Sequence, residues 1–332
     1  MQTRTFSFLR NRLRHRKAAP TPAPQGVLQF VPRDAGLFSN INFLVGEIHR
    51  GVEAFPLFAA QEQTQIGHAY RQFSYVDPGC ANSWFEFFAP ISYAEGDVRH
   101  HDLEFVRSRP RTNGEFATAE FRTPAATLAL YRRPDFGSWR VRVHAHASDK
   151  IKPAPRVRGE VEALLATMPA RRIGVHVRHP SHVVEQGRVL FDDYFRLIDA
   201  RLAADPALGI FLATDTELAV AAFRIQYGDR VTFHRGIMRT SIDDVLRWAY
   251  ALTHAQQDED GFVRGQGFQT HFKVAASGDG KAGLRAGREA ACDLFTLAAC
   301  DELVCTVSNF TLACAYLHPL QRQHLVAPGM PY

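Results

Sequence analysis

The chain has 332 residues and a formal net charge of +5, from 39 Lys and Arg against 34 Asp and Glu. Hydrophobic residues make up 46% of it, which is typical of globular proteins, and the length accommodates two domains of ordinary size. Residues 1–17 contain six Lys or Arg and no acid, so the rest of the chain is close to neutral. A near-neutral body indicates no nucleic-acid partner, because nucleic-acid-binding proteins present a basic face.

The N-terminal residues and the cysteines predict where the protein resides. Residues 1–25 join this basic stretch to three prolines, and we interpret them as either a disordered tail or a basic helix at the inner membrane surface. No apolar run reaches the roughly 18 to 20 residues of a membrane span, and the N-terminus lacks a signal-peptide pattern. Five cysteines without metal-ligand spacing favour reduced thiols. The sequence therefore predicts a cytoplasmic protein, with peripheral membrane contact through residues 1–17 left open.

The first pattern in chain order is a strand, a loop and a helix. An apolar run at residues 27–31 is followed by Gly36–Asn42, and apolar residues then recur at helical spacing from Ile41. Ser39 or Asn40 is the expected N-cap of this helix. Such a turn presents backbone N–H groups that suit a diphosphate or a sugar hydroxyl, although a glycine at this place also serves as a simple turn.

Two further segments of the N-terminal half have distinct compositions. Six aromatic residues lie between Tyr75 and Tyr93, and they indicate either core packing or a surface that stacks on a sugar. The alternating segment Trp139–His144 predicts a strand. His100–Asp102 has the residue types of a metal site, but adjacent residues on a strand point to opposite faces, so we expect a solvated loop.

The C-terminal half alternates between predicted strands and predicted helices. Buried parallel strands read as apolar runs, and segments with apolar residues at helical spacing separate the runs of this half. The predicted strands are Ile173–Arg178, Gly209–Ala213, Val231–Phe233 and Leu303–Val307, and the predicted helices are Val157–Met168, Phe191–Ala204, Glu217–Tyr227, Arg288–Leu297 and Thr311–Leu317. This order predicts a doubly wound α/β sheet.

Charged and polar residues end three of these strands. Arg178 closes the first strand, and Asp215 and Ser308 come directly after two others. Ligands of doubly wound sheets bind outside the carboxyl ends of the strands, where a guanidinium matches two oxygens of a phosphate or carboxylate. The helix after Ser308 points its N-terminus the same way, which also favours an anion. A surface ion pair is the alternative for Arg178 taken alone.

Residues 256–288 interrupt the alternation with six glycines from Gly261 to Gly283 and with mixed charges. A loop of this length in a compact domain indicates a mobile lid or a disordered insertion. Asp258–Asp260 within it matches the letters of an Asp-x-Asp metal motif, but we interpret it as a solvated charge run. The sequence therefore predicts no metal and no other cofactor.

Several of these segments occur together, in the same order and at similar intervals, in one group of enzymes. The segments are Gly36–Asn40, Gly174–Arg178, Leu212–Asp215 and Asp293–Ser308. They resemble the two-lobed fucosyltransferases: the rhizobial nodulation fucosyltransferases, the core α1,6-fucosyltransferases and the protein O-fucosyltransferases. The resemblance covers most of residues 27–320.

The resemblance implies a GT-B fold, with two Rossmann-like lobes facing a central cleft that binds GDP-fucose. The charged, proline-containing stretch Lys150–Pro155 indicates a domain boundary near it. We therefore expect residues 1–25 to be a tail, residues 26–160 an acceptor-side lobe and residues 161–332 a nucleotide-sugar-binding lobe. The implied reaction is transfer of fucose to a glycan, a lipid-linked saccharide or another hydroxyl acceptor. Another donor such as GDP-mannose, or binding without transfer, remains an alternative.

The resemblance also implies roles for individual residues. Arg178 grips the β-phosphate with His176 beside it, and Asp293 holds the guanosine. The other donor-binding residues are Asn40 facing the sugar, Asp215 at the end of the middle strand, and Ser308, Asn309 and Phe310 at the turn that reaches the diphosphate.

The sequence departs from the core fucosyltransferases directly after Arg178. It continues with His179–His182 in place of their second arginine and its following residues, and it has Asn309 where they have a second serine. The acceptor and the base therefore do not carry over. Inversion at the sugar carbon requires a group that takes the acceptor proton, and Glu185 is the nearest downstream carboxylate. Arginine and a helix N-terminus stabilise the leaving diphosphate without a metal.

Overall fold

The computed structural model describes residues 28–30, 36–49, 51, 53–58, 64–66, 69–71, 75–77, 80–93, 96–97, 129–178, 189–246 and 282–326. The predictions for residues 1–25, for His100–Asp102, for His179–Glu185 and for most of residues 256–288 lie outside this part of the chain. No helix within the described ranges is long and apolar enough to cross a membrane. All five cysteines are free thiols, as predicted.

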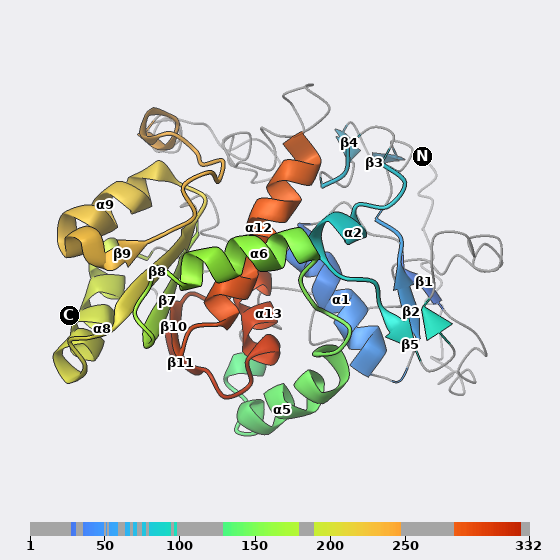
Figure 1. Cartoon of the computed structure of the whole chain (residues 1–332), viewed down its shortest axis with the longest axis horizontal. Coiled ribbons are helices and arrows are strands. Elements are labelled where there is room, and N and C mark those ends of the chain that lie inside the picture. Colours follow the sequence, from blue (N-terminus) through green and yellow to red (C-terminus); the bar gives the residue numbers. More distant parts are fainter. Residues whose placement is uncertain are drawn as a thin grey trace, which may run out of the picture.

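A five-stranded parallel sheet organises the C-terminal half (Figure 1). Its strands are β7 (Arg172–Val177), β8 (Gly209–Thr214), β9 (Val231–Thr232), β10 (Glu302–Cys305) and β11 (Arg322–Leu325). Their spatial order is β11-β10-β7-β8-β9, and every neighbouring pair is parallel. The chain winds outward from β7 through β8 to β9, then crosses to the other side of β7 for β10 and β11. This Rossmann-like order confirms the predicted doubly wound α/β sheet.

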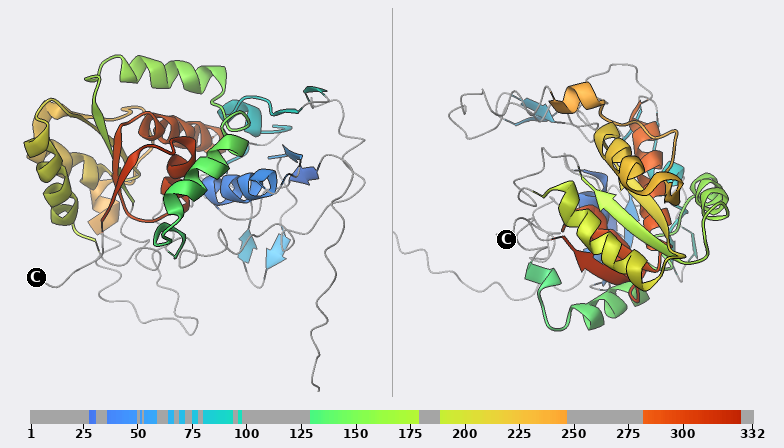
Figure 2. Two further views of the ribbon diagram at one scale, coloured as in Figure 1. Left: turned by 90° about the horizontal axis from the view of Figure 1, so that it is seen from below. Right: turned by 90° about the vertical axis from the view of Figure 1, so that its left-hand side faces the viewer.

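Helices cover both faces of this sheet (Figures 1 and 2). One face is covered by α8 (Phe191–Ala204) and α9 (Glu217–Tyr227), and the short 3-10 turn η5 (Gly228–Arg230) leads from α9 into β9. The other face is covered by α12 (Ala282–Ala298) and α13 (Asn309–Leu317), and α6 (Pro155–Leu165) packs across α12. Side chains of β7 alternate between the two faces: Ile173, Val175 and Val177 join the core under α8 and α9. Gly174 faces α12, whose Leu297 lies directly above it.

The N-terminal half begins with a β-α-β unit. β1 (Leu28–Phe30) and β2 (Ala54–Pro56) are parallel, and α1 (Leu37–His49) connects them. The other elements are α2 (Trp84–Phe87), α5 (Phe136–Ala147) and the antiparallel pairs β3 (Thr64–Ile66) with β4 (Ala69–Arg71) and β5 (Ser92–Tyr93) with β6 (Gly96–Asp97). α1 packs against α5 and α13, and one hydrophobic core runs from α1 and α2 to α12 and α13. The two halves therefore share a core.

Two predictions for the N-terminal half were wrong. Trp139–His144 belongs to helix α5 and not to a strand, because Trp139, Val143 and Ala147 at helical spacing are its buried apolar side chains. The N-cap of the first helix is neither Ser39 nor Asn40. The amide of Asn40 already donates to the carbonyl of Gly36 at 3.2 Å, the helical i to i−4 bond, so α1 starts at Leu37.

Candidate active site

The register of the sheet brings three strand ends together. His176 of β7 pairs with Cys305 of β10 on one side and with Ala213 of β8 on the other. Arg178, Asp215 and the turn that leads to Ser308 therefore leave the sheet at the same edge. The direction of winding reverses between β7 and β10, and this switch point is where Rossmann-like sheets bind their ligands.

A tyrosine from the N-terminal half lies at the same edge. Burial raises the pKa of the Tyr75 hydroxyl; the charge of Arg178 counteracts this effect and that of Asp215 adds to it. The main chain of Leu37, at the start of α1, forms a hydrogen bond with the same hydroxyl. Tyr75 thus connects Arg178 and Asp215 with the first turn of α1. The sequence indicated only that Tyr75 belongs to an aromatic segment.

The turn after β10 closes on itself and starts α13. Ser308 is the N-cap: its Oγ accepts from the Thr311 amide at 3.2 Å, and Thr311 Oγ1 accepts from the Ser308 amide at 3.0 Å. This reciprocal capping fixes the first turn of the helix, whose N-terminus carries a partial positive charge. Ser308 is 5% exposed, and its hydroxyl serves the cap at the start of α13.

Two of the predicted donor-binding residues form an aromatic stack. The ring centres of His176 and Phe310 lie 4.6 Å apart, and the two rings are within 11° of parallel. The ring of Phe38, from α1, meets the Phe310 ring edge-on, with 4.3 Å between their centres. Phe310 is 6% exposed and His176 7% exposed. The stack therefore fixes β7, α13 and α1 relative to one another behind the strand ends.

Asparagines join α1 to α13 near this stack. Asn42 Nδ2 donates to both the backbone carbonyl and Oδ1 of Asn309 at 3.0 Å, and its Oδ1 accepts from the Tyr316 hydroxyl at 2.9 Å. Asn40 is fully buried and donates from Nδ2 to the Gly36 carbonyl at 3.3 Å. Asn309 is thus held by the N-terminal half, and Asn42, which the sequence did not single out, is what holds it.

Asp293 reaches the site from α12. The carboxyl group is buried, with the residue 7% exposed, and Oδ1 accepts no hydrogen bond from the described residues. Burial is the main cause that raises the pKa of Asp293 well above its usual range; Glu289 and Asp215 add to this, and Arg239 lowers it. Asp215, at the end of β8, is thus among the charges that act on Asp293.

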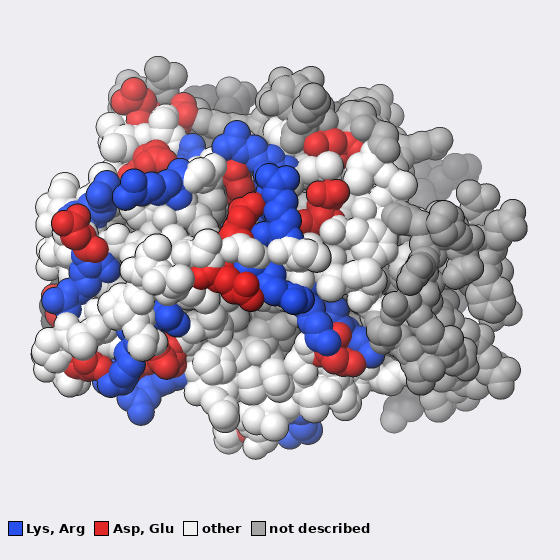
Figure 3. All heavy atoms as spheres, in the orientation of Figure 1, with Lys and Arg blue, Asp and Glu red and all other residues white. Residues whose placement is uncertain are grey.

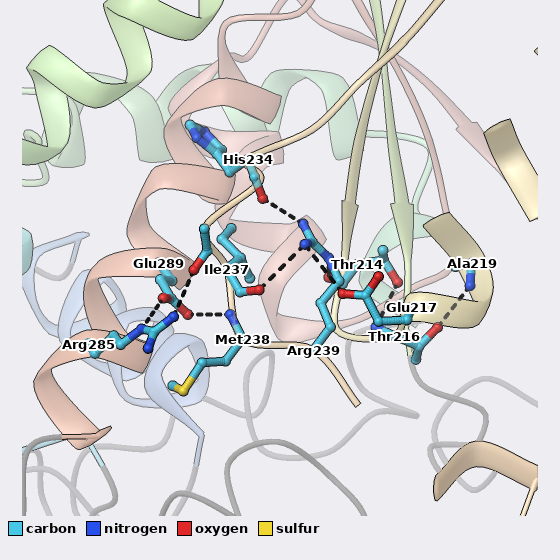
Figure 4. Close-up of polar contacts among 11 residues, drawn as sticks. Thr214, Thr216, Glu217, Ala219, His234, Ile237, Met238, Arg239, Arg285 and Glu289 are labelled. Carbon is cyan, nitrogen blue, oxygen red and sulfur yellow. Dashed lines mark hydrogen bonds and ion pairs between the residues drawn. The ribbon is translucent and has the colours of Figure 1, made fainter. Parts of the chain in front are cut away.

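Arg239 is another residue that the sequence did not reveal. It lies in the loop of residues 234–240 after β9, and its side chain is 2% exposed. Figure 4 shows the guanidinium within that loop, donating to the backbone carbonyls of His234 at 2.8 Å, Thr214 at 3.2 Å and Ile237 at 3.4 Å. No periodicity or motif marks this arginine, because its partners are main-chain atoms of its own loop and of β8.

Charges of both signs are interleaved on the outer face of α6 and α12 (Figure 3). Arg285 pairs with Glu289 at 2.7 Å, and Glu160 lies 3.3 Å from Arg156 and 3.9 Å from Arg288. Within the described ranges, no three His, Cys, Asp or Glu side chains gather as a potential metal site. Glu185, the predicted base, lies outside these ranges.

No family model matches the chain, and no curated protein sequence is similar to it. Solved structures are similar over most of the chain. NodZ α-1,6-fucosyltransferase soaked with GDP-fucose matches with 15% identity and a TM-score of 0.47, covering 88% of this chain and 92% of NodZ. Fucosyltransferase NodZ from Bradyrhizobium matches with 14% identity and a TM-score of 0.46, covering 88% and 93%. POFUT1 in complex with GDP-fucose matches with 9% identity and a TM-score of 0.43, covering 91% and 98%. Identities this low leave the donor and the acceptor of this chain to be argued from its own site.

Proposed function

We propose that the protein is an inverting, metal-independent glycosyltransferase of the two-lobed GT-B kind, which transfers fucose from GDP-fucose to a hydroxyl of a glycan or lipid-linked saccharide. One observation carries the proposal: at the switch point between β7 and β10, Arg178 follows one strand and the N-terminus of α13 follows the other. A guanidinium opposite a helix N-terminus suits a ligand with two adjacent phosphates.

The chemistry of sugar transfer explains why these groups are needed. The bond between the sugar carbon and the β-phosphate breaks through an oxocarbenium-like transition state, and negative charge develops on the leaving diphosphate. Arg178 and the helix start of α13 stabilise that charge because they are already oriented when the bond breaks. The capping of α13 by Ser308 and Thr311 keeps the helix start in place without a bound ligand.

Asp293 binds the nucleoside half of the donor in this proposal. A buried carboxyl group with an unpaired oxygen suits a base that presents adjacent N–H groups, as guanine does and uracil does not, because these donors favour its charged form. GDP should therefore bind more tightly than UDP, which would leave buried polar groups unpaired at about 1–3 kcal/mol each. Asn40 and Asp215 complete the proposed donor site on the sugar side.

The acceptor hydroxyl must lose a proton when it attacks the sugar carbon from the face opposite the diphosphate. We assign this step to Glu185, which follows Arg178 by seven positions in the sequence. Tyr75, which lies beside Arg178 and Asp215, lines the same edge from the N-terminal half. The proposal therefore keeps residues 26–160 as the side from which the acceptor approaches.

Turnover of GDP-fucose by matched arginine variants tests the proposal. Arg178→Ala should lose on the order of 10²-fold in GDP release with a saccharide acceptor, the usual loss for a contact made to developing charge. Arg178→Lys should recover only part of the rate, because an ammonium lacks the planar fork. Arg158→Ala, which removes an exposed arginine of α6, should behave as wild type.

The outcome also separates the alternatives. Wild-type turnover of GDP-fucose by Arg178→Ala would reject the phosphate-gripping role. Turnover of GDP-mannose in preference to GDP-fucose would keep the site and change the donor. If GDP raises the melting temperature but neither donor is hydrolysed or transferred, the protein binds nucleotides without transferring sugar.

A further inference from the structure

Asn309, the first residue of α13, is held by a side chain from the other half of the molecule. Asn42 Nδ2 donates to the backbone carbonyl of Asn309 and to its Oδ1, both at 3.0 Å. Asn42 is fully buried on α1, and Asn309 is half-buried. The two residues lie 267 positions apart in the sequence, so the contact forms only when the two halves of the chain pack together.

The hydrogen bonds fix which way each amide group faces. A backbone carbonyl can only accept, so the Asn42 atom that contacts the Asn309 carbonyl is the Nδ2 donor. The other end of the same amide, Oδ1, accepts from the hydroxyl of Tyr316 at 2.9 Å, and Tyr316 is fully buried. Because Asn42 Nδ2 donates, the side-chain atom of Asn309 that it meets is the acceptor Oδ1. The Nδ2 group of Asn309 therefore faces away from Asn42.

This Nδ2 group lies at the proposed donor site. Among the described residues none accepts a hydrogen bond from it, and the atom is not buried. Its neighbours in sequence belong to that site: Ser308 caps α13, and the ring of Phe310 stacks on His176, two positions before Arg178. The start of α13 thus presents a side-chain donor in addition to its backbone.

The orientation of this amide matters because a diphosphate offers only acceptor oxygens. An N–H group directed at a phosphate oxygen forms a hydrogen bond to a charged acceptor, whereas an amide oxygen in the same place would repel it. With its Oδ1 already bound to Asn42, the side chain of Asn309 presents the donor. A ligand then does not have to order this side chain when it binds, which favours its affinity.

We propose that Asn42 is a positioning residue for donor binding: it orients the side chain of Asn309 so that Nδ2 donates to the diphosphate, and Tyr316 in turn orients Asn42. This inference rests on the proposed function, because it assumes that a nucleoside diphosphate binds at the start of α13. It gives α1, an element of the N-terminal half, a share in binding the donor.

A double-mutant cycle, measured by titration calorimetry with GDP and with pyrophosphate, tests the inference. Asn309→Ala should weaken both ligands about tenfold or more, the usual loss for a hydrogen bond to a charged group. Asn42→Ala should weaken both about threefold to tenfold, because the Asn309 side chain must then be ordered by the ligand. In protein that already carries Asn309→Ala, Asn42→Ala should have no further effect on either affinity. Asn42→Ser replaces Asn42→Ala in the cycle if the alanine variant does not fold.

Two further variants separate the contact from stability. Asn309→Asp keeps the acceptor that Asn42 binds and replaces only the donor, so it should weaken both ligands at least as much as Asn309→Ala. It should melt no lower than wild type, because a negative charge is favourable in the first turn of a helix. Asn82→Ala is the matched control: Asn82 is also a buried asparagine of the N-terminal half, and it bonds to the backbone of Pro56 at 2.7 Å and Phe58 at 2.9 Å. Asn82→Ala should lower the melting temperature and leave both affinities as in wild type.

The inference is overturned if Asn309→Ala or Asn42→Ala leaves both affinities unchanged. It is also overturned if Asn42→Ala weakens the ligands as much in the Asn309→Ala protein as in wild type, or if Asn82→Ala weakens them equally. Failure of the wild-type protein to bind GDP would instead reject the proposed function, and the first titration shows this before any variant is compared.

Discussion

Asp293 carries a buried carboxyl group whose charge the ligand-free protein disfavours. Burial raises its pKa first, and Glu289 and Asp215 raise it further against the effect of Arg239. The folded protein therefore holds this proton at pH values where the unfolded chain has lost it. The free energy of unfolding should fall as the pH rises above the ordinary range of an aspartate, until the pH exceeds the raised pKa.

Asp293→Asn should accordingly stabilise the ligand-free protein. We expect a gain of about 1–3 kcal/mol in the free energy of unfolding at pH 8, the usual cost of an unsatisfied buried group, and a smaller gain at pH 5. Urea unfolding at the two pH values measures both. Asp229→Asn, which changes an exposed aspartate of η5, should show neither gain. A loss of stability in Asp293→Asn at pH 8 would mean that the carboxylate is satisfied in the folded protein.

At the scale of single residues, the sequence predicted residues that end strands, and it missed residues whose partners are loop carbonyls or a helix distant in the sequence. Arg178 and Asp215 follow apolar runs, and the topology of a doubly wound sheet brings such positions to one edge. Arg239 and Asn42 carry no such signal. The first bonds to backbone carbonyls of a loop, and the second bonds to a helix 267 positions away in the sequence.

Among the elements, β7 and α12 approach each other closely because β7 contains a glycine. A Cβ atom at Gly174 would lie 2.8 Å from Leu297 Cδ2 and 3.3 Å from Cys300 Cβ. Leu297 and Cys300 are both fully buried in the core. The close approach places Asp293, one turn before Leu297 on the same helix, over the sheet.

Gly174→Ala should therefore destabilise the protein by about 1–3 kcal/mol, the usual cost of overpacking a core. Gly159→Ala is the matched control, because a Cβ there meets no atom within 4 Å on the outside of α6. It should stabilise the protein by about 0.5–1 kcal/mol, since alanine favours a helix over glycine. Urea unfolding of both variants decides the point: equal stability of Gly174→Ala and wild type would contradict the close packing.

The elements of the C-terminal half were predictable, and α5 was not, for a physical reason. Strands and helices of the doubly wound sheet are buried, so their apolar patterns are long and regular. In α5 the residues Trp139–His144 alternate over a short stretch and therefore predict a strand. The buried residues Trp139, Val143 and Ala147 have the i, i+4 spacing of a helix, which this short alternation hides. Arg140, which looks like a surface residue in sequence, is 7% exposed and donates to the carbonyls of Ala315, His318 and Gln321.

For the whole molecule, the sequence predicted two halves but not how they join. The hydrophobic core that includes α1, α2, α12 and α13 runs across the boundary proposed at residue 160. Its contacts connect positions far apart in the chain, such as Phe38 with Phe310, and no local pattern encodes them. The proposed site depends on this junction, because Tyr75 and Asn42 reach the strand ends from the N-terminal half.

The central claim is that the edge formed by β7, β8 and β10 binds a nucleoside diphosphate through Arg178. Titration calorimetry of GDP in EDTA tests it most directly, with wild type, Arg178→Ala and the exposed control Arg158→Ala. We predict one GDP site in wild type and in Arg158→Ala, with nearly the same affinity when Mg²⁺ replaces EDTA. In Arg178→Ala both GDP and pyrophosphate should bind about tenfold or more weakly, because a charge-assisted bidentate contact is lost. Unchanged GDP affinity in Arg178→Ala, or binding that requires Mg²⁺, would contradict this account.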